Sequence, residues 1–272
     1  MSASIDAMST SIERGSGPPV VLLHGQPGSG GSWDPVTSLL EADARVLAPD
    51  RIGYGASVGE ARGLADNAEL VAELIGARGA APATVVAHSW AGGAAVLLAD
   101  RYPAVVKSLV LVGAACTPDS LNALDRWLNL PIVGGVLTVI GLLGIEEVLP
   151  RVRPLARYAP TRFRDKLASA LPDSRVMGDE RGALGRHKRA FMIEQHALVD
   201  EMPLVTAALG RLEIPVAVVH GDWDLVVPPR AAVSLVRAIP GAELTLLPRA
   251  GHFVVRDDPT ALAHVIRRAM RS

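Results

Sequence analysis

Three residue types that together support nucleophilic catalysis each lie shortly after an apolar run of this sequence. Ser89 follows the run Ala83–Ala87 and precedes small residues, so we expect it on a tight strand-to-helix turn that exposes its hydroxyl. On its own, the position also suits a serine that caps a helix. His252 follows the run Glu243–Leu247, and an imidazole there could take the serine proton and later return it to a leaving group.

A carboxylate would complete this set, and two aspartates are candidates for it. Asp222 and Asp224 lie just past the apolar run Val216–Val219. A buried carboxylate fixes the tautomer of the histidine ring and stabilises the imidazolium that forms during catalysis. Position alone leaves both aspartates open. His88, next to the serine, should point away from the site and serve as a packed structural residue.

A glycine-containing loop could stabilise the developing oxyanion of an acyl-transfer reaction. The apolar run Val20–Leu23 leads into the loop His24–Gly28. Acyl transfer needs two backbone N–H donors aimed at the oxyanion, and the natural pair is the N–H groups of Gln26 and Trp90. A phosphate-binding loop is excluded because no Gly-Lys-Ser/Thr sequence follows. An ordinary connection between a strand and a helix remains the alternative.

These residues need a scaffold that brings them to one place, and the pattern of the chain predicts a parallel sheet covered by helices. Apolar runs without polar alternation are typical of strands buried on both faces, and helical patterns alternate with them here. The expected strands are Val20–Leu23, Arg45–Ala48, Ala83–Ala87, Val105–Val112, Val216–Val219 and Glu243–Leu247. The expected helices are Ser32–Ala42, Leu64–Arg78, Ala91–Arg101, Pro229–Ala238 and Pro259–Ala269, the last capped by Asp258.

The alternation of strands and helices stops between Thr117 and Leu212, where only helical stretches and loops appear. We therefore expect a core domain of residues 1–116 and 213–272. Residues 117–212 are expected to form a helical cap inserted after the fourth of these strands.

Two features of the predicted cap bear on its surroundings. The uncharged stretch Leu130–Ile145 is shorter than the ~20 residues of a membrane span and contains Pro and Gly, so it predicts a buried or cleft-lining segment, with a segment at a membrane surface as the alternative. We expect no stable membrane insertion. The basic residues between positions 151 and 189 form either a solvated surface or one that attracts anionic groups.

Composition excludes several functional classes. The chain has 272 residues, of which 49% are hydrophobic and 20% charged, as in a globular protein with a large core. A net charge of −1 and only 4% aromatic residues argue against nucleic-acid binding. The single cysteine, Cys116, excludes an internal disulfide, and no His, Asp and Glu cluster has the spacing of a metal site, so neither metal nor cofactor is expected. The first residues lack a signal-peptide pattern, which favours the cytoplasm. Nothing in the sequence indicates the oligomeric state.

The motifs, taken together, resemble those of the α/β-hydrolase fold superfamily, of the esterase, lipase and epoxide-hydrolase type with a helical cap. The order serine, aspartate, histidine along the chain is that of the superfamily. The resemblance departs from the usual Gly-x-Ser-x-Gly elbow at Ala87 and Ala91, where each extra methyl group needs a slightly wider crossing. It covers Val20–Ala115 and Leu212–Ala269 and includes the oxyanion loop His24–Gly28, the turn Asp50–Ser57, the acid loop Gly221–Pro228 and the histidine loop Gly251–Phe253.

This resemblance implies an α/β architecture with a mostly parallel, doubly wound sheet and a cap. It implies that Ser89 is the nucleophile, His252 the base and Asp224, rather than Asp222, the acid of the triad. Superfamily members that act on epoxides or haloalkanes use an aspartate nucleophile, so the serine here argues against both. From their positions in loops, rather than from the resemblance, the residues expected to contact the substrate are Trp33, Tyr54, Trp223 and Phe253, and burial in the core is the alternative for such aromatic residues.

The expected function is cofactor-independent hydrolysis of a carboxylic ester, or a related acyl bond, in a moderately hydrophobic small molecule through an acyl-enzyme. A related triad also serves cleavage of a carbon–carbon bond in a β-diketone-like substrate, lactone hydrolysis and perhydrolysis, which the sequence does not separate. The alternative from another class is a ligand-binding protein that kept the fold and lost turnover.

Overall fold

Six parallel strands end along one edge of a single sheet. The computed structural model describes residues 8, 10–130, 134–138, 140 and 184–272 of the chain. Within these residues seven strands pair in the order β1-β3-β2-β4-β5-β6-β7, with only β1 antiparallel to its neighbour. The strands are β1 (Thr10–Arg14), β2 (Pro19–Leu23), β3 (Arg45–Pro49), β4 (Ala83–His88), β5 (Val106–Val112), β6 (Val216–Gly221) and β7 (Glu243–Leu247).

The six strands expected from the sequence are confirmed, with ends that differ by at most two residues. The central strand β4 is buried along its whole length, which explains why its sequence carries no polar alternation. Strand β1 is not predicted from the sequence, because Ile12 is the only large apolar residue of that segment. As an edge strand, β1 needs few apolar side chains and forms its hydrogen bonds with β3 alone.

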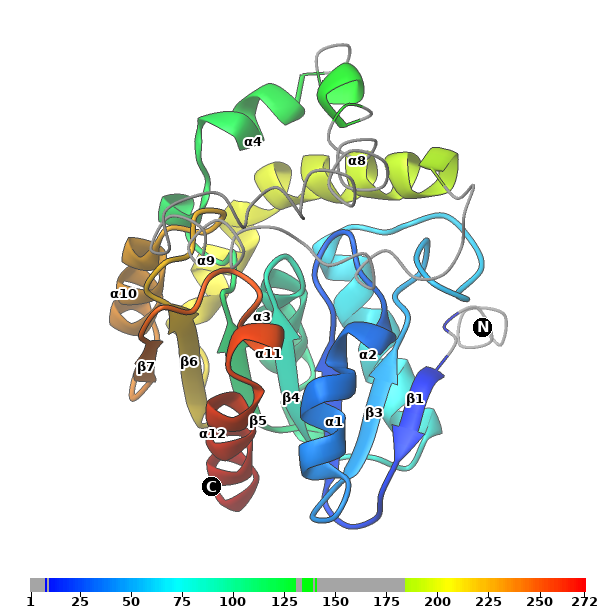
Figure 1. The fold of residues 1–272 in the computed structure, drawn as a ribbon, viewed down its shortest axis with the longest axis vertical. Coiled ribbons are helices and arrows are strands. Elements are labelled where there is room, and N and C mark those ends of the chain that lie inside the picture. Colours follow the sequence, from blue (N-terminus) through cyan, green and yellow to red (C-terminus); the bar gives the residue numbers. More distant parts are fainter. Residues whose placement is uncertain (1–7, 9, 131–133, 139, 141–183) are drawn as a thin grey trace, which may run out of the picture.

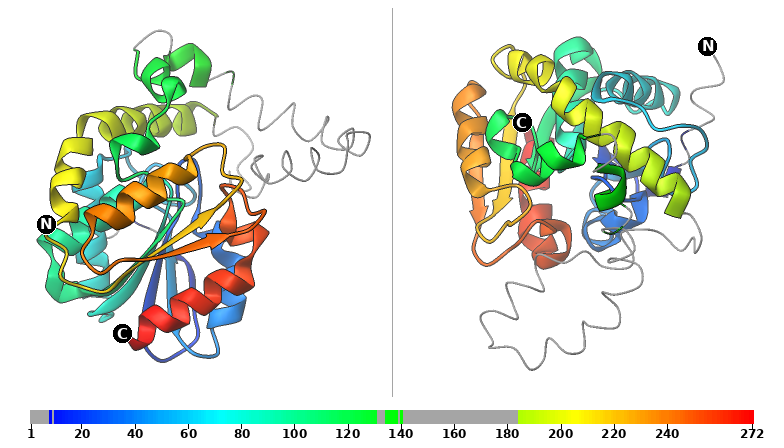
Figure 2. Two further views of the ribbon diagram at one scale, coloured as in Figure 1. Left: turned by 90° about the vertical axis from the view of Figure 1, so that its left-hand side faces the viewer. Right: turned by 90° about the horizontal axis from the view of Figure 1, so that it is seen from above.

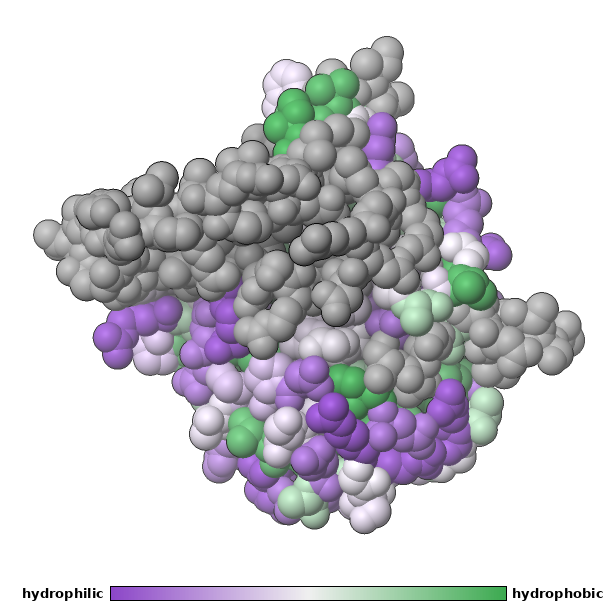
Figure 3. Space-filling model, turned by 45° about the vertical axis from the view of Figure 1, so that its right-hand side comes forward, coloured by the Kyte–Doolittle hydropathy of each residue, from purple (hydrophilic) through white to green (hydrophobic). Residues whose placement is uncertain are grey.

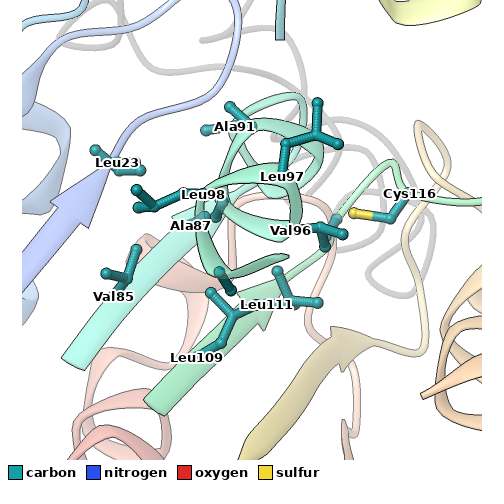
Figure 4. Packing of buried hydrophobic residues seen from close by; sticks show 14 of the residues in the cluster. Leu23, Val85, Ala87, Ala91, Val96, Leu97, Leu98, Leu109, Leu111 and Cys116 are labelled. Carbon is teal, nitrogen blue, oxygen red and sulfur yellow. The ribbon is translucent and has the colours of Figure 1, made fainter. Parts of the chain in front are cut away.

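Helices cover both faces of the sheet (Figures 1 and 2). One apolar layer holds α1 (Asp34–Leu40) and α12 (Pro259–Arg271). The other holds α2 (Leu64–Ala77), α3 (Ala91–Arg101), α9 (Met202–Leu209) and α10 (Pro229–Ala238). Figure 4 shows how side chains of α3, among them Val96 and Leu98, pack over β4 and β5. The Asp258 side chain accepts the Ala261 N–H at the start of α12, as expected for a helix cap.

Two further helices, α4 (Ala123–Leu128) and α8 (Leu184–Asp200), lie at the end of the molecule toward which the parallel strands run (Figure 1). Both belong to the range predicted to form the cap, whose boundaries stay a prediction. Residues 141–183, with most of the basic residues of that range, and part of Leu130–Ile145 lie outside the described residues. The remaining short helices are η1 (Gly30–Trp33), η2 (Pro103–Val105), η3 (Pro118–Ser120) and α11 (Val254–Asp257).

The surface differs between the two ends of the molecule. Hydrophilic side chains dominate the end away from α4, and exposed apolar side chains gather near α4 and the segment that follows it (Figure 3). Trp127, Leu130, Val136 and Ile140 are exposed there. None of the helices in the described ranges is both long and apolar enough to cross a membrane.

Two glycines in helices offer a matched test of this packing. A Cβ atom on Gly92 of α3 would lie 2.5 Å from the Ala114 side chain and 3.0 Å from Cys116 Sγ, whereas one on Gly76 of α2 would meet nothing within 4 Å. We expect Gly92→Ala to lower the free energy of unfolding by about 1–3 kcal/mol through overpacking. Gly76→Ala should raise it by about 0.5–1 kcal/mol because alanine favours the helix. Urea unfolding followed by circular dichroism measures both, and a Gly92→Ala protein as stable as the Gly76→Ala protein would contradict the close crossing.

Candidate active site

Ser89 occupies a sharp turn between β4 and α3. Its φ angle is +55°, a left-handed conformation that few residues other than glycine adopt. The backbone is held there because the Ser89 N–H donates to Val112 O at 2.9 Å and its carbonyl accepts the N–H groups of Gly92 and Ala115. The residue at the helix cap position of α3 is Trp90, and no side chain caps that helix. The expected strand-to-helix turn is therefore observed, and the alternative of a helix-capping serine is not.

The turn is crowded on both sides. A Cβ atom on Gly25 would lie 2.9 Å from Ser89 Cβ and 3.1 Å from His88 Nδ1, so the loop after β2 approaches the serine without a side chain. Ala87 and Ala91, which replace the usual elbow glycines, are fully buried. The close approach is thus made by Gly25 and Gly92, while the crossing accommodates the two alanine methyl groups.

The structure brings His252 and Asp224 to the serine as a hydrogen-bonded chain. His252 lies in the loop between β7 and α11, and its Nε2 is 3.0 Å from Ser89 Oγ. Its Nδ1 is 2.8 Å from Asp224 Oδ2, in the loop between β6 and α10. Both loops start at the carboxyl ends of parallel strands, as the sequence predicts. This arrangement can move a proton from the serine hydroxyl to the imidazole.

Asp224 and Asp222 have different environments. The Asp224 side chain is fully buried, and its Oδ1 accepts the N–H groups of Val226 and Val227 at 2.8 and 2.9 Å. Asp222 is exposed, and its Oδ1 accepts the Arg249 N–H at 2.6 Å. Arg249 has a left-handed backbone conformation, with a φ angle of +63°. Only Asp224 contacts His252, and Asp222 stabilises the turn that leads to it.

These contacts determine the charge of Asp224 and the position of the ring proton on His252. Burial alone would raise the pKa of Asp224, but His252 and the hydrogen bonds to the carboxylate hold that pKa below its ordinary value. An ionised Asp224 only accepts hydrogen bonds, so Nδ1 of His252 carries the ring proton and Nε2 is left as the acceptor for the serine hydroxyl. His220, whose Nε2 lies 3.4 Å from Asp224 Oδ2 and 2.9 Å from Val227 O, has a pKa lowered by burial.

The His88 side chain faces the site, contrary to the expectation from the sequence. Instead of pointing away, its ring packs against that of His252, with centroids 4.8 Å apart, and it lines the cavity described below. Its Nε2 lies 2.9 Å from the backbone carbonyl of His252. Burial and the nearby His252 lower the pKa of His88 to about 3, so the ring is neutral at physiological pH and supports His252 without competing for a proton.

The two backbone N–H groups expected to hold an oxyanion flank Ser89. Gln26 follows Gly25, which touches the serine, and Trp90 follows the serine directly at the start of α3. Within the described part of the chain, neither N–H donates to a protein acceptor. The start of a helix adds a partial positive charge at Trp90. Both donors are therefore free to bind a negative oxygen beside the serine.

A cavity of about 400 Å³ opens above Ser89 and reaches α4 and α8. Two of the four residues predicted to contact the substrate, Trp33 and Phe253, line it. The structure places the other two outside the described wall of this cavity. Tyr54 is buried elsewhere, where its hydroxyl donates to Glu194, and Trp223 does not reach the wall. Further apolar lining comes from Pro27, Pro35, Ala115, Leu128, Phe191, Leu198, Leu225, Val226, Val227 and Val255.

Polar side chains form one part of the cavity wall. Gln26 Nε2 donates to Gln195 Oε1 at 2.9 Å, and Gln195 Nε2 donates to Asp125 Oδ1 at 3.2 Å. Sequence reasoning missed Gln195 and Asp125 because no local pattern links three residues so far apart in the chain. In the ranges that the structure describes, no group of three or more His, Cys, Asp or Glu side chains is placed to hold a metal ion.

Comparison with known proteins identifies the family. The model of the alpha/beta hydrolase family matches residues 20–265. A pimeloyl-[acyl-carrier protein] methyl ester esterase of Chromobacterium violaceum is 30% identical over 88% of this chain and 88% of its own. A 2-hydroxymuconate semialdehyde hydrolase of Pseudomonas putida is 27% identical over 93% and 87% of the two chains. The solved structure of a thermophilic esterase from Thermogutta terrifontis matches with a TM-score of 0.73 at 22% identity, over 97% and 93%. The chain therefore belongs to the alpha/beta hydrolase family.

Proposed function

We propose that this protein is a cofactor-independent serine hydrolase that cleaves a carboxylic ester, or a related acyl bond, of a moderately hydrophobic small molecule. The observation that carries the proposal is the chain of hydrogen bonds from Ser89 Oγ through His252 to Asp224, with distances of 3.0 and 2.8 Å. A serine hydroxyl is a poor nucleophile unless a base removes its proton in the transition state, and this chain provides the base and its orienting carboxylate.

In the first half of the reaction, Ser89 Oγ attacks the carbonyl carbon of the substrate while His252 Nε2 takes the hydroxyl proton. Asp224 keeps the ring in place and stabilises its positive charge. The tetrahedral intermediate then breaks its bond to the leaving alcohol, which receives the proton from His252. The acyl group stays on Ser89 as an ester.

In the second half, His252 takes a proton from water, and the resulting nucleophile attacks the acyl carbon. Collapse of this intermediate breaks the bond to Ser89 Oγ, which regains its proton from His252. The backbone N–H groups of Gln26 and Trp90 hold the oxyanion in both halves. The net reaction consumes one ester and one water and yields an acid and an alcohol.

The cavity supports a small, largely apolar substrate. Its volume of about 400 Å³ lies within the range of small-molecule sites, and apolar side chains make up most of its wall. Trp33 and Phe253 contact the substrate in this proposal. Residues 117–212 act as a cap, because Leu128, Phe191 and Leu198 of that range line the same cavity as Ser89.

Carbon–carbon bond hydrolysis is the second candidate, favoured by the likeness to a 2-hydroxymuconate semialdehyde hydrolase at 27% identity. A muconate semialdehyde carries a carboxylate. In the described wall of the cavity, Asp34 is paired with Arg14 and Arg256 with Asp257, while the Asp125 carboxylate accepts hydrogen bonds from neutral groups. This charge distribution favours the neutral ester over the anionic dienoate.

A paired substrate assay separates the two reactions. We expect kcat/KM for p-nitrophenyl butyrate to exceed that for 2-hydroxymuconate semialdehyde by about 10-fold or more, since the Asp125 carboxylate in the cavity wall repels an anionic substrate. Release of p-nitrophenol and loss of the dienoate absorbance measure the two rates. A higher kcat/KM for the dienoate would contradict the proposed ester hydrolysis and would support carbon–carbon bond cleavage.

Replacing the nucleophile should abolish turnover and leave the fold intact. Ser89→Ala removes the attacking oxygen while alanine tolerates the left-handed turn about as well as serine does. We expect kcat on p-nitrophenyl esters to fall by about 10⁴-fold or more. A fluorophosphonate probe should label the wild-type protein at Ser89 and leave the variant unlabelled. Turnover at the wild-type rate would show that another residue is the nucleophile, and a wild-type protein that is never labelled would favour a binding role.

The two aspartates form a matched pair for testing the acid. Asp224→Asn places an amide against His252 Nδ1, so the ring adopts the other tautomer and kcat should fall by about 10²–10⁴-fold. Asp222→Asn keeps an oxygen for the Arg249 N–H and should change kcat by less than about threefold. Steady-state kinetics at pH 8 compare them. A larger loss for Asp222→Asn would move the acid to position 222.

A further inference from the structure

A buried arginine lies beneath the loop that supplies one of the two proposed oxyanion donors. Arg51 follows β3, and 1% of its side chain is exposed. Its Nε donates to His24 O and its Nη2 to Gly25 O, each at 2.9 Å. The guanidinium also lies over the ring of Trp90, 4.5 Å from the centroid. One side chain therefore contacts both segments that would hold the oxyanion.

His24 supports the same carbonyl. Its Nε2 accepts the Arg51 backbone N–H at 3.0 Å, so the ring proton resides on Nδ1, which lies 2.8 Å from Gly25 O. Burial and the neighbouring Arg51 charge hold the pKa of His24 well below its ordinary value, so the ring is neutral. The Gly25 carbonyl thus has two donors, one cationic and one neutral.

These two contacts fix the direction of an N–H group. Gly25 O and the Gln26 N–H belong to one peptide unit, and in a trans peptide the C=O and N–H point in opposite directions. Because Arg51 and His24 hold the oxygen on the buried side of the loop, the N–H faces the cavity beside Ser89. A glycine at position 25 would otherwise let this peptide rotate easily. Rotation would present a carbonyl oxygen to the oxyanion and repel it.

A second set of contacts ties this arrangement to helix α8. Glu194 of α8 is fully buried and pairs with both terminal nitrogens of Arg51. Its backbone carbonyl accepts Trp90 Nε1–H at 2.8 Å, and its carboxylate accepts the Tyr54 hydroxyl at 2.9 Å. A buried guanidinium needs such a partner, because an unpaired charge there is strongly destabilising. Both proposed oxyanion donors are therefore connected to residue 194.

We propose that Arg51, held by Glu194 of α8, is a positioning residue that keeps the Gln26 N–H directed at the oxyanion. The proposal rests on the serine hydrolase function proposed above. Arg51 does not touch the substrate, since it is absent from the described cavity wall. Its effect belongs to the transition state, where negative charge develops on the oxygen, and not to the binding of a neutral ester.

Two inhibitors with the same carbon skeleton test this separation. A trifluoromethyl ketone adds to Ser89 and forms an oxyanion, and the matching secondary alcohol binds without one. In Arg51→Lys, the ammonium keeps a charge for Glu194 but lacks the planar set of donors that serves His24 O and Gly25 O together. We expect the Ki of the ketone to rise by about 10–100-fold and kcat to fall in parallel, while KM and the Ki of the alcohol change less than about twofold.

Arg45→Lys is the matched control, because Arg45 binds Glu13 and Arg78 O at the amino end of β3, away from the site. It should leave both inhibition constants unchanged. Equal rises of the two constants in Arg51→Lys would mean general damage to the site and would overturn the proposal, as would an unchanged ketone constant. A wild-type protein that never binds the ketone would instead overturn the hydrolase function itself.

A pair of variants at His24 keeps the proposal testable if Arg51→Lys does not fold. Asn places an amide near the position of Nδ1 and keeps a donor for Gly25 O, whereas Gln reaches toward the position of Nε2 and loses that donor. We expect His24→Asn to retain the ketone Ki within about threefold and His24→Gln to raise it about tenfold. Identical behaviour of the two variants would contradict control of the Gly25–Gln26 peptide.

Discussion

The left-handed backbone of Ser89 is the constraint on which the rest of the site depends. Such a conformation persists only where the surroundings over-determine it. Here the hydrogen bond to Val112 O, the bonds that Ser89 O accepts from Gly92 of α3 and from Ala115 after β5, and the close approach of Gly25 all act on the same residue. The turn projects the hydroxyl beyond the edge of the sheet, where side chains from other loops can reach it.

Parallel pairing then brings the other groups to that edge. The loops after β6 and β7 place Asp224 and His252 in line with the serine, although 28 residues separate them in the chain. Three further histidines, His24, His88 and His220, have pKa values lowered by burial and are neutral. The rings of His88 and His220 near His252 thus carry no charge, and the Asp224 carboxylate is the counter-charge to the protonated form of His252. Low local polarity strengthens both this pairing and the proposed oxyanion contacts.

Much of this could be predicted from the sequence, because the governing signals are local. Buried strands read as apolar runs, and the turn at Ser89 and the loop at Gly25 need small residues in fixed places. The edge strand β1 escaped prediction because a strand paired on one side needs little apolar character. The resemblance of the acid loop to that of the superfamily, rather than position in the sequence, favoured Asp224. In the structure, Asp222 instead accepts the Arg249 N–H.

The contacts that could not be predicted from the sequence join residues that lie far apart in the chain. Tyr54 lies in a motif expected to border the pocket, yet its hydroxyl is committed to Glu194, 140 residues later. Arg51 and Glu194 pair across 143 residues, and neither carries a local mark of the other. His88 was expected to face away from the site because the adjacent Ser89 faces it. At this sharp turn, however, the ring of His88 packs against the ring of His252. Such pairings depend on how segments pack, which no window of the sequence contains.

The most direct test of the account is a crystal structure of the protein after reaction with an alkyl fluorophosphonate. The account predicts phosphorus bonded to Ser89 Oγ, with the phosphoryl oxygen at roughly 2.7–3.1 Å from the backbone nitrogens of both Gln26 and Trp90. A phosphoryl oxygen directed away from those two nitrogens, or an adduct on a residue other than Ser89, would contradict it.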